Sequence, residues 1–307
     1  MQQTGAQTHV KDPRNDAVRI YVNGKLVPRG EAVVSVFDSG FVLGDGVWEG
    51  FRLVDGVVVF AEQHLDRLFA GARTIALDIG KTRQQVLAAI QETCRANAMT
   101  DGAHIRLMVT RGPKSTPNQD PRNVVGPPTI VIAAEYKQPD PAIKKNGITL
   151  FTSTFRCSAP DVFDLRLNSH SRLNLIQALL QAIEAGAHEA LMLDPAGFVA
   201  SCNSTNFFIV ARDRVVTSTG RFNFKGITRQ NVIDLCAANA IAVEQRDFTL
   251  AETYNADEAF VTGTFGGVTP VARIDGRTIG SSRPGPITAR LDRLYQDLVA
   301  SNARAGK

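Results

Sequence analysis

The sequence predicts an α+β protein built from two domains. Strand-like alternation and helix-like spacing of apolar residues occur in both halves, and one charged, proline-containing break separates the halves. The chain has 307 residues, 44% of them apolar, which is enough to bury a sizeable core. We expect a disordered tail at 1–17, an N-terminal α+β domain at 18–135, an interdomain linker at 136–146 and a C-terminal α/β domain at 147–307.

The N-terminal domain is expected to begin with two hairpins. Residues 19–35 alternate as strands do, and Asn23-Gly24 supplies the first tight turn. Asp55-Gly56 joins the apolar runs at 48–53 and 57–60 in the same way. Helical spacing and then further strands are indicated by Leu65, Leu68, Phe69 and Ile75, by Val86, Ile90 and Cys94, and by the runs at 104–111 and 129–134.

The C-terminal domain is expected to mix strands and helices. One helix is indicated by four apolar residues that share a face and end before Gly186, namely Leu173, Ile176, Leu180 and Ile183. The other elements are predicted at 148–154, 190–194, 206–210, 215–216 and 258–262 for strands, and at 228–239 and 287–299 for helices.

Composition and charge exclude several classes of protein. Lys and Arg together exceed Asp and Glu by four (34 against 30), and the basic residues are scattered, so no nucleic-acid partner is predicted. The four cysteines are far apart, so neither a metal site nor a disulfide framework is predicted. The chain shows no secretory leader and no apolar run of membrane length. We expect a cytoplasmic protein without a membrane partner.

A long loop, GPKSTPNQDPRNVVGPP, separates the predicted strands at 104–111 and 129–134. Its length and its prolines and glycines are typical of loops that cover binding sites. The alternative is a mobile insertion without a role in binding.

Three short motifs could bind an anion. Gly226, Ile227 and Thr228 begin a predicted helix, where unpaired N–H groups favour a phosphate, although an ordinary threonine cap explains them too. VTGTFGG offers hydroxyls and glycine amides at Gly263 and Thr264. HLDRL contains Arg67, which could hold a phosphate or be a solvated helix residue.

Five motifs in this order resemble the class IV aminotransferase family. They are GDGVWEGFR, HLDRL, GAHEALMLD, GITR and DEAFVTGT, and the likeness extends over about residues 19–300. The resemblance implies the two-domain fold type IV architecture, a pyridoxal 5'-phosphate (PLP) cofactor in the C-terminal domain and a homodimer. It also implies a phosphate site made of Arg67, Gly226, Ile227, Thr228, Gly263 and Thr264.

Two positions depart from the family pattern. Counting back from GAHEALMLD and forward from Asp164 places Asn168 where the family has its Schiff-base lysine. Asparagine has no amine that could bind the cofactor covalently. The family acid that pairs with the pyridine nitrogen falls on Ser201, and a hydroxyl does not keep that nitrogen protonated as a carboxylate does. The residues for cofactor chemistry are exchanged, whereas those for the phosphate remain.

Other residues could replace the lysine in part. His170 is a candidate general base, although a lone histidine is more often structural. Lys225 is implied at the phosphate end of the cofactor, and Arg172 forms imines poorly because it stays protonated. For the substrate pocket the resemblance implies Leu43, Trp48 and Arg106, the last of these for carboxylates, while packing explains Leu43 and Trp48 equally well.

The sequence therefore predicts an aminotransferase-like protein with a non-standard site. We expect it to bind PLP non-covalently, or pyridoxamine phosphate, with an amine, an amino acid or a keto acid as the small-molecule partner. The alternatives are a catalytically inactive pseudoenzyme that binds a ligand, and a lyase similar to aminodeoxychorismate lyase.

Overall fold

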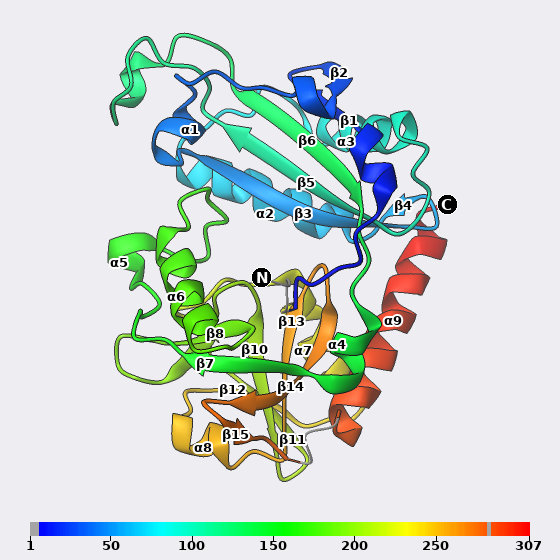
Figure 1. Ribbon diagram of the computed structural model, residues 1–307, viewed down its shortest axis with the longest axis vertical. Coiled ribbons are helices and arrows are strands. Elements are labelled where there is room, and N and C mark those ends of the chain that lie inside the picture. The colour runs from blue at the N-terminus through cyan, green and yellow to red at the C-terminus, as the bar shows by residue number, and fades with distance from the viewer. Residues whose placement is uncertain (1–5, 281–283) are drawn as a thin grey trace. The chain divides into compact units, whose positions relative to one another are not determined.

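The chain folds into two compact units in a computed structural model that describes residues 6–280 and 284–307 (Figure 1). The N-terminal unit contains residues 11–138, 167–172 and 299–307. The C-terminal unit contains residues 1–10, 139–166 and 173–298, of which 1–5 and 281–283 lie outside the described residues. Segment 167–172, which carries Asn168, therefore packs with the N-terminal unit although the chain on both sides of it belongs to the other unit.

The N-terminal unit is built on an antiparallel sheet. In the described part of this unit the strand order is β2-β1-β6-β5-β3-β4, and every neighbouring pair is antiparallel. The strands are β1 Arg19–Val22, β2 Lys25–Pro28, β3 Gly46–Val54, β4 Val57–Val58, β5 Ala103–Thr110 and β6 Thr129–Tyr136. The helices are α1 Ser39–Leu43, α2 Ala61–Thr74 and α3 Arg83–Ala96, with 3-10 turns η1 Pro13–Ala17, η2 Arg29–Glu31 and η3 Pro121–Asn123.

Apolar side chains of α2 and α3 form one core with this sheet. Helix α2 packs on β3, and α3 packs on β1 and β6 (Figure 1). Leu65 and Leu68 of α2 and Ile90 of α3 are fully buried, as the helical spacing of the sequence predicted. Both predicted hairpins are confirmed, with β1 paired to β2 and β3 to β4.

The last residues of the expected disordered tail are ordered by contacts with β6. Residues 13–17 form η1, and Asn15 holds this turn against β6: its Nδ2 donates to the Tyr136 carbonyl at 2.9 Å and its Oδ1 accepts from the Tyr136 N–H at 2.8 Å. Because asparagine satisfies both backbone groups of Tyr136, this short polar segment extends the edge of the folded unit. Residues 1–5 of the expected tail lie outside the described residues.

The C-terminal unit contains a mixed sheet. Among its described strands the order is β12-β11-β10-β13-β14-β7-β8-β9, with β15 paired to β14. The strands are β7 Ile148–Thr152, β8 Glu189–Leu193, β9 Val199–Cys202, β10 Asn206–Ala211, β11 Arg214–Thr217, β12 Val243–Gln245, β13 Glu258–Gly263, β14 Gly267–Ile274 and β15 Arg277–Thr278. The helices are α4 Pro141–Asn146, α5 Pro160–Phe163, α6 Leu173–Glu184, α7 Ile227–Ala238, α8 Leu250–Tyr254 and α9 Pro286–Ala305.

Burial within α6 falls on the side opposite to its large apolar residues. The fully buried residues are the small Ala178 and Ala182, which face the sheet where α6 packs on β7 and β8. The four large residues of the predicted apolar face are exposed in this chain, with fractions of 68% for Leu173, 52% for Ile176, 59% for Leu180 and 45% for Ile183. Periodicity found the helix but could not tell which of its faces meets the core.

No helix in residues 6–280 and 284–307 is long and apolar enough to cross a membrane.

Candidate functional site

A buried carboxylate anchors two basic residues of α2 in the N-terminal unit. Glu49 of β3 is 0% exposed, and His64 and Arg67 reach it from one face of α2, three positions apart. Arg67 donates from Nε to Oε1 and from Nη2 to Oε2, both at 2.7 Å. His64 Nδ1 lies 2.7 Å from Oε2. The guanidinium of Arg67 is thus held in a fixed orientation by a fork of two charge-assisted bonds.

The charges in this cluster decide its protonation state. Burial would raise the pKa of Glu49, but the charge and hydrogen bonds of Arg67, together with the His64 bond, outweigh it and lower the pKa to about 2. Burial lowers the pKa of His64, against the opposing pull of Glu49. His64 is therefore a neutral imidazole that donates from Nδ1 to an ionised carboxylate.

Segment 167–172 attaches to the start of β3. The Trp48 N–H donates to the Asn168 carbonyl at 3.0 Å and the His170 N–H donates to the Gly46 carbonyl at 3.1 Å, which forms an antiparallel bridge between Val47 and Ser169. Gly46 is required here, because a Cβ atom would lie 2.7 Å from His170 Cδ2 and would overlap the Val109 carbonyl oxygen. The segment adds a short extra strand at this end of β3.

Both ends of the Asn168 side-chain amide take part in this attachment. Its Nδ2 donates to the Trp48 carbonyl at 2.6 Å, and its Oδ1 accepts from Arg172 Nη2 at 2.6 Å. Asn168 is 3% exposed. A buried amide with partners for both its donor and its acceptor is a stabilising contact, and it is a role that a lysine ammonium, which only donates, could not fill.

Two arginines lie near the indole of Trp48. The Arg106 guanidinium carbon lies 3.4 Å from the centre of the ring, and that of Arg172 lies 5.9 Å from it. Burial lowers the pKa of each arginine to about 10; for Arg106 the charge of Glu49 opposes this, and for Arg172 the charges of Arg67 and Arg106 add to it. Both remain charged at neutral pH, so this part of the unit has excess positive charge.

His170 is a neutral imidazole in this surrounding. Burial and the charge of Arg106 lower its pKa to about 4. Its Nε2 is buried and has no hydrogen-bond partner among the described residues. At neutral pH this nitrogen can accept a proton, although with less driving force than an ordinary imidazole.

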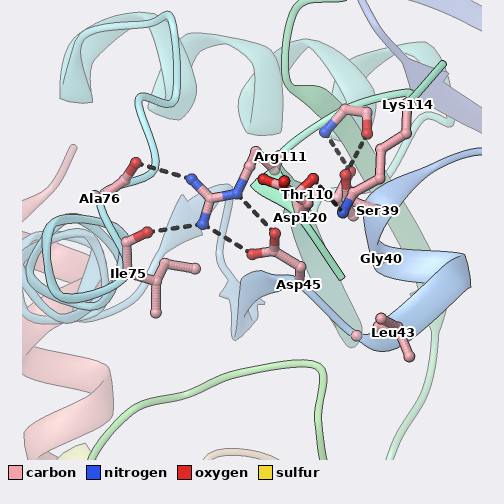
Figure 2. Close-up of polar contacts among 12 residues, drawn as sticks. Ser39, Gly40, Leu43, Asp45, Ile75, Ala76, Thr110, Arg111, Lys114 and Asp120 are labelled. Carbon is pink, nitrogen blue, oxygen red and sulfur yellow. Dashed lines mark hydrogen bonds and ion pairs between the residues drawn. The ribbon is translucent and has the colours of Figure 1, made fainter. Parts of the chain in front are cut away.

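Polar contacts hold the loop that follows β5 (Figure 2). Arg111 binds Asp45 through two bonds, at 2.7 and 2.9 Å, and also donates to the carbonyls of Ile75 and Ala76. Lys114 is 4% exposed and donates to the carbonyls of Asn118 and Asp120 within the loop. Arg111 thus ties the start of the loop to neighbouring elements, and Lys114 ties the loop to itself. For this loop the sequence allowed two interpretations, a cover over a binding site and a mobile insertion. Leu43, at the end of α1, is 57% exposed.

In the C-terminal unit the start of α7 has the properties of an anion site. Gly226 is its N-cap and provides no side-chain cap, so the first N–H groups of the helix are left to other partners. A Cβ atom at Gly226 would overlap Asn206 Oδ1. The Nδ2 of the same asparagine donates to the Phe224 carbonyl at 2.6 Å. Thr228 is 2% exposed, and its Oγ1 lies 3.3 Å from the Tyr295 hydroxyl.

Strand β13 ends at Gly263, and Thr264 begins the turn into β14. Among the described residues, a Cβ atom at Gly263 would touch Thr205 Cγ2 alone, at 3.4 Å. These residues and the start of α7 fit a phosphate group. Hydrogen bonds from Arg166 lower the pKa of Asp164, and the charge of Lys225 adds to this effect.

Ser201 of β9 is buried, and its hydroxyl contacts other residues of the chain. Oγ donates to the Thr205 carbonyl at 3.0 Å and accepts from Asn206 Nδ2 at 3.3 Å. The position therefore offers a hydroxyl whose bonds are satisfied internally, and it supplies no carboxylate to a ring nitrogen.

Sequence reasoning missed three titratable residues. Glu49 and His64 lie within the motifs GDGVWEGFR and HLDRL, but Trp48 and Arg67 were chosen from these motifs as candidate site residues. Glu189 of β8 is a buried carboxyl whose pKa burial raises to about 7, and it accepts from Thr205 Oγ1 at 2.7 Å. A glutamate inside an otherwise apolar strand is the signal that could have identified Glu49 and Glu189, because unpaired charges are rarely buried.

The two-domain α+β fold is that of fold type IV aminotransferases. The structure matches the T.th. branched-chain amino acid aminotransferase with pyridoxamine 5'-phosphate, with a TM-score of 0.87 and 29% identity over 93% of this chain and 95% of that one. It matches the branched-chain aminotransferase of Escherichia coli with a TM-score of 0.86 and 25% identity over 93% and 96%.

Residues 46–274 match the family model described as amino-transferase class IV, and the chain belongs to that family. It is 40% identical over 289 residues to the branched-chain-amino-acid aminotransferase-like protein 2 of Arabidopsis thaliana. The match covers 94% of this chain but 51% of that relative, so the chain spans about half its length. A putative branched-chain-amino-acid aminotransferase of Methanocaldococcus jannaschii is 40% identical over 92% of this chain and 96% of its own.

The Glu49 cluster leads to a prediction about acid stability. The pKa of Glu49 is about 2 in the folded chain against an ordinary 4.5, so its contribution is complete above pH 4.5 and disappears as the pH falls to about 2. The difference corresponds to about 3 kcal/mol. In urea unfolding at a series of pH values, Glu49→Gln should be less stable at pH 7 and should lose less stability on acidification. Glu62→Gln, which removes an exposed carboxylate on α2, the helix that carries His64 and Arg67, is the control. Equal acid sensitivity of wild type and Glu49→Gln would contradict this role.

Proposed function

We propose that the chain binds pyridoxal 5'-phosphate or pyridoxamine phosphate without a covalent bond to a lysine. Its nearest chemistry is amino-group transfer from an amino acid or amine to a keto acid. The observation that carries this proposal is the combination of an uncapped α7 N-terminus with an Asn168 amide that is bound by Trp48 and Arg172. The first supports a phosphate site, and the second supplies no amine.

The residues of the C-terminal unit would hold the phosphate. The N–H groups at the start of α7 and the Thr228 hydroxyl offer donors in a buried setting, and the helix dipole favours a negative group there. When bound, pyridoxal phosphate supplies an electrophilic aldehyde and an electron-accepting ring. Ser201 at the ring-nitrogen position would leave that electron-accepting property weaker than a carboxylate would.

Residues of the N-terminal unit would orient the carboxylate of the substrate and accept a proton from the substrate. Arg106, stacked on Trp48, presents a cation suited to a carboxylate. His170 Nε2 is the atom that would accept a proton. Because the pKa of His170 is about 4, this transfer is less favourable than to an ordinary imidazole, and we expect slow turnover.

The competing function is ligand binding without catalysis. It is favoured by the fact that the Asn168 amide and the Ser201 hydroxyl are both engaged by the chain itself. This alternative accepts the same phosphate ligand but predicts no amino transfer to any keto acid, even when pyridoxamine phosphate is supplied.

Cofactor binding can be measured by calorimetry on the ligand-depleted protein. We expect pyridoxamine phosphate to bind, and Thr228→Val to weaken the binding about tenfold or more, because a hydrogen bond to a charged phosphate is lost. Thr74→Val, at an exposed threonine of α2, is the matched control and should bind as wild type does. No binding to wild type would refute the proposal. Binding without amino transfer to a panel of keto acids would select the inactive alternative.

We propose that the chain forms a homodimer, in line with the family resemblance. The exposed apolar face of α6, formed by Leu173, Ile176, Leu180 and Ile183, supports this, since an apolar face of this kind marks an interaction surface. Light scattering should give twice the chain mass of 33.2 kDa, and Ile176→Lys with Leu180→Lys should shift the protein toward monomer. A monomeric wild type, or a double variant that stays dimeric, would refute α6 as the contact.

A further inference from the structure

Segment 167–172 forms hydrogen bonds with three groups of Trp48: its backbone N–H, its backbone carbonyl and its indole N–H. Its N–H donates to the Asn168 carbonyl, its carbonyl accepts from Asn168 Nδ2, and its indole Nε1 donates to the Ser169 carbonyl at 3.0 Å. Bonds to both backbone and ring leave the indole little freedom to rotate. Its orientation thus depends on where Asn168 and Ser169 lie.

Arg172 holds that segment in turn. It donates from Nε to the Ser169 carbonyl at 3.0 Å, and from Nη2 to the Leu167 carbonyl at 3.2 Å and to Asn168 Oδ1 at 2.6 Å. One planar guanidinium therefore ties three successive residues together. Arginine suits this task because its donors are fixed in one plane.

The position of Arg106 depends on this arrangement, because Arg106 stacks on Trp48. Its guanidinium carbon lies 3.4 Å from the centre of the Trp48 ring, in a register of β3 and β5 that sets Trp48 opposite Met108 and Gly50 opposite Arg106. Within residues 6–280 and 284–307 the structure gives it no hydrogen bond and no ion pair. Its N–H donors are of the kind that bind a carboxylate.

The surrounding charge favours an anion. Glu49 is the carboxylate that acts electrostatically on both Arg106 and Arg172, and it is already bonded by Arg67 and His64. Arg67, Arg106 and Arg172 repel one another, and a bound carboxylate would relieve that repulsion.

We propose that Asn168 and Arg172 are positioning residues that clamp Trp48 and so fix Arg106 as a preformed carboxylate receptor. The ligand class is a small carboxylate, the kind of acid group that an amino acid or keto acid carries. This inference rests on the proposed function for the identity of the acid. It gives Asn168 a task of its own at the position of the family lysine.

Trp48 is the one tryptophan of the sequence, so its fluorescence reports on this site alone. The full-length protein is titrated with isovalerate, and with isovaleramide as the uncharged comparison. Wild type should respond saturably to isovalerate but not to the amide. Asn168→Leu, which keeps the size of the side chain, and Arg172→Met should each weaken isovalerate binding about tenfold or more. Without ligand, both should also make Trp48 more accessible to acrylamide quenching.

Two further variants make the outcome decisive. Arg14→Met removes a similar stack, since Arg14 lies 3.5 Å from the Tyr136 ring centre in the same unit, and it should change neither readout. Arg172→Lys keeps the charge but not the planar fork, and its intermediate weakening tests the clamp if Asn168→Leu does not fold.

The failures of the two proposals are distinguishable. If Arg106→Met alone loses binding, and Asn168→Leu and Arg172→Met match wild type in affinity and quenching, the clamp is overturned and the proposed acid recognition stands. If wild type does not respond to isovalerate, the receptor is overturned together with the acid recognition of the proposed function. The cofactor binding measured by calorimetry is independent of both results.

Discussion

The side-chain amide of Asn168 is the contact on which this site depends. It joins the carbonyl of Trp48 on β3 to the guanidinium of Arg172, and it does so in a buried position where an unmet donor or acceptor is costly. Around it, segment 167–172 becomes part of the N-terminal unit. In the proposed clamp, the orientation of Trp48, and with it that of Arg106, depends on this carboxamide together with the backbone carbonyls of Asn168 and Ser169.

The electrostatics of the N-terminal unit suit recognition of an acid better than proton transfer. Three arginines are balanced by one carboxylate, and the histidines near them, His64, His104 and His170, have lowered pKa values and are neutral at physiological pH. A negatively charged ligand would be attracted and held by these arginines, whereas this group of residues contains no strong general base. In the C-terminal unit the start of α7 has no side-chain cap, and the Ser201 hydroxyl donates to the Thr205 carbonyl.

Local sequence patterns were sufficient for much of the fold. Hairpin turns at 23–24 and 55–56 and the helices α2, α3, α6 and α7 rest on interactions between near neighbours, so turn residues and periodicity predict them. Strand β14 was missed because Gly267 and Pro270 interrupt its pattern, and its stability comes from β13 and β7 on either side. The exposed side of α6 was also beyond prediction, because spacing identifies an apolar face but not what covers it.

The candidate site was predictable as single positions and not as contacts. The family resemblance marked Asn168, Ser201, Arg67 and Trp48, but Glu49 meets His64 and Arg67 across 15 and 18 residues of sequence, through packing of α2 on β3. Likewise the stacking of Arg106 on Trp48 depends on the register of β3 and β5, and the clamp depends on a bridge between Val47 and Ser169. Such contacts arise from tertiary structure, which a pattern in one segment does not encode.

The central claim is that the chain holds its cofactor without a lysine bond, because the family position is taken by an amide with satisfied hydrogen bonds. Borohydride reduction of the protein loaded with pyridoxal phosphate, followed by intact-mass and peptide mass spectrometry, tests it most directly. We predict an unmodified chain and release of the reduced cofactor on denaturation. A stable cofactor adduct on any lysine, Lys225 included, would contradict it.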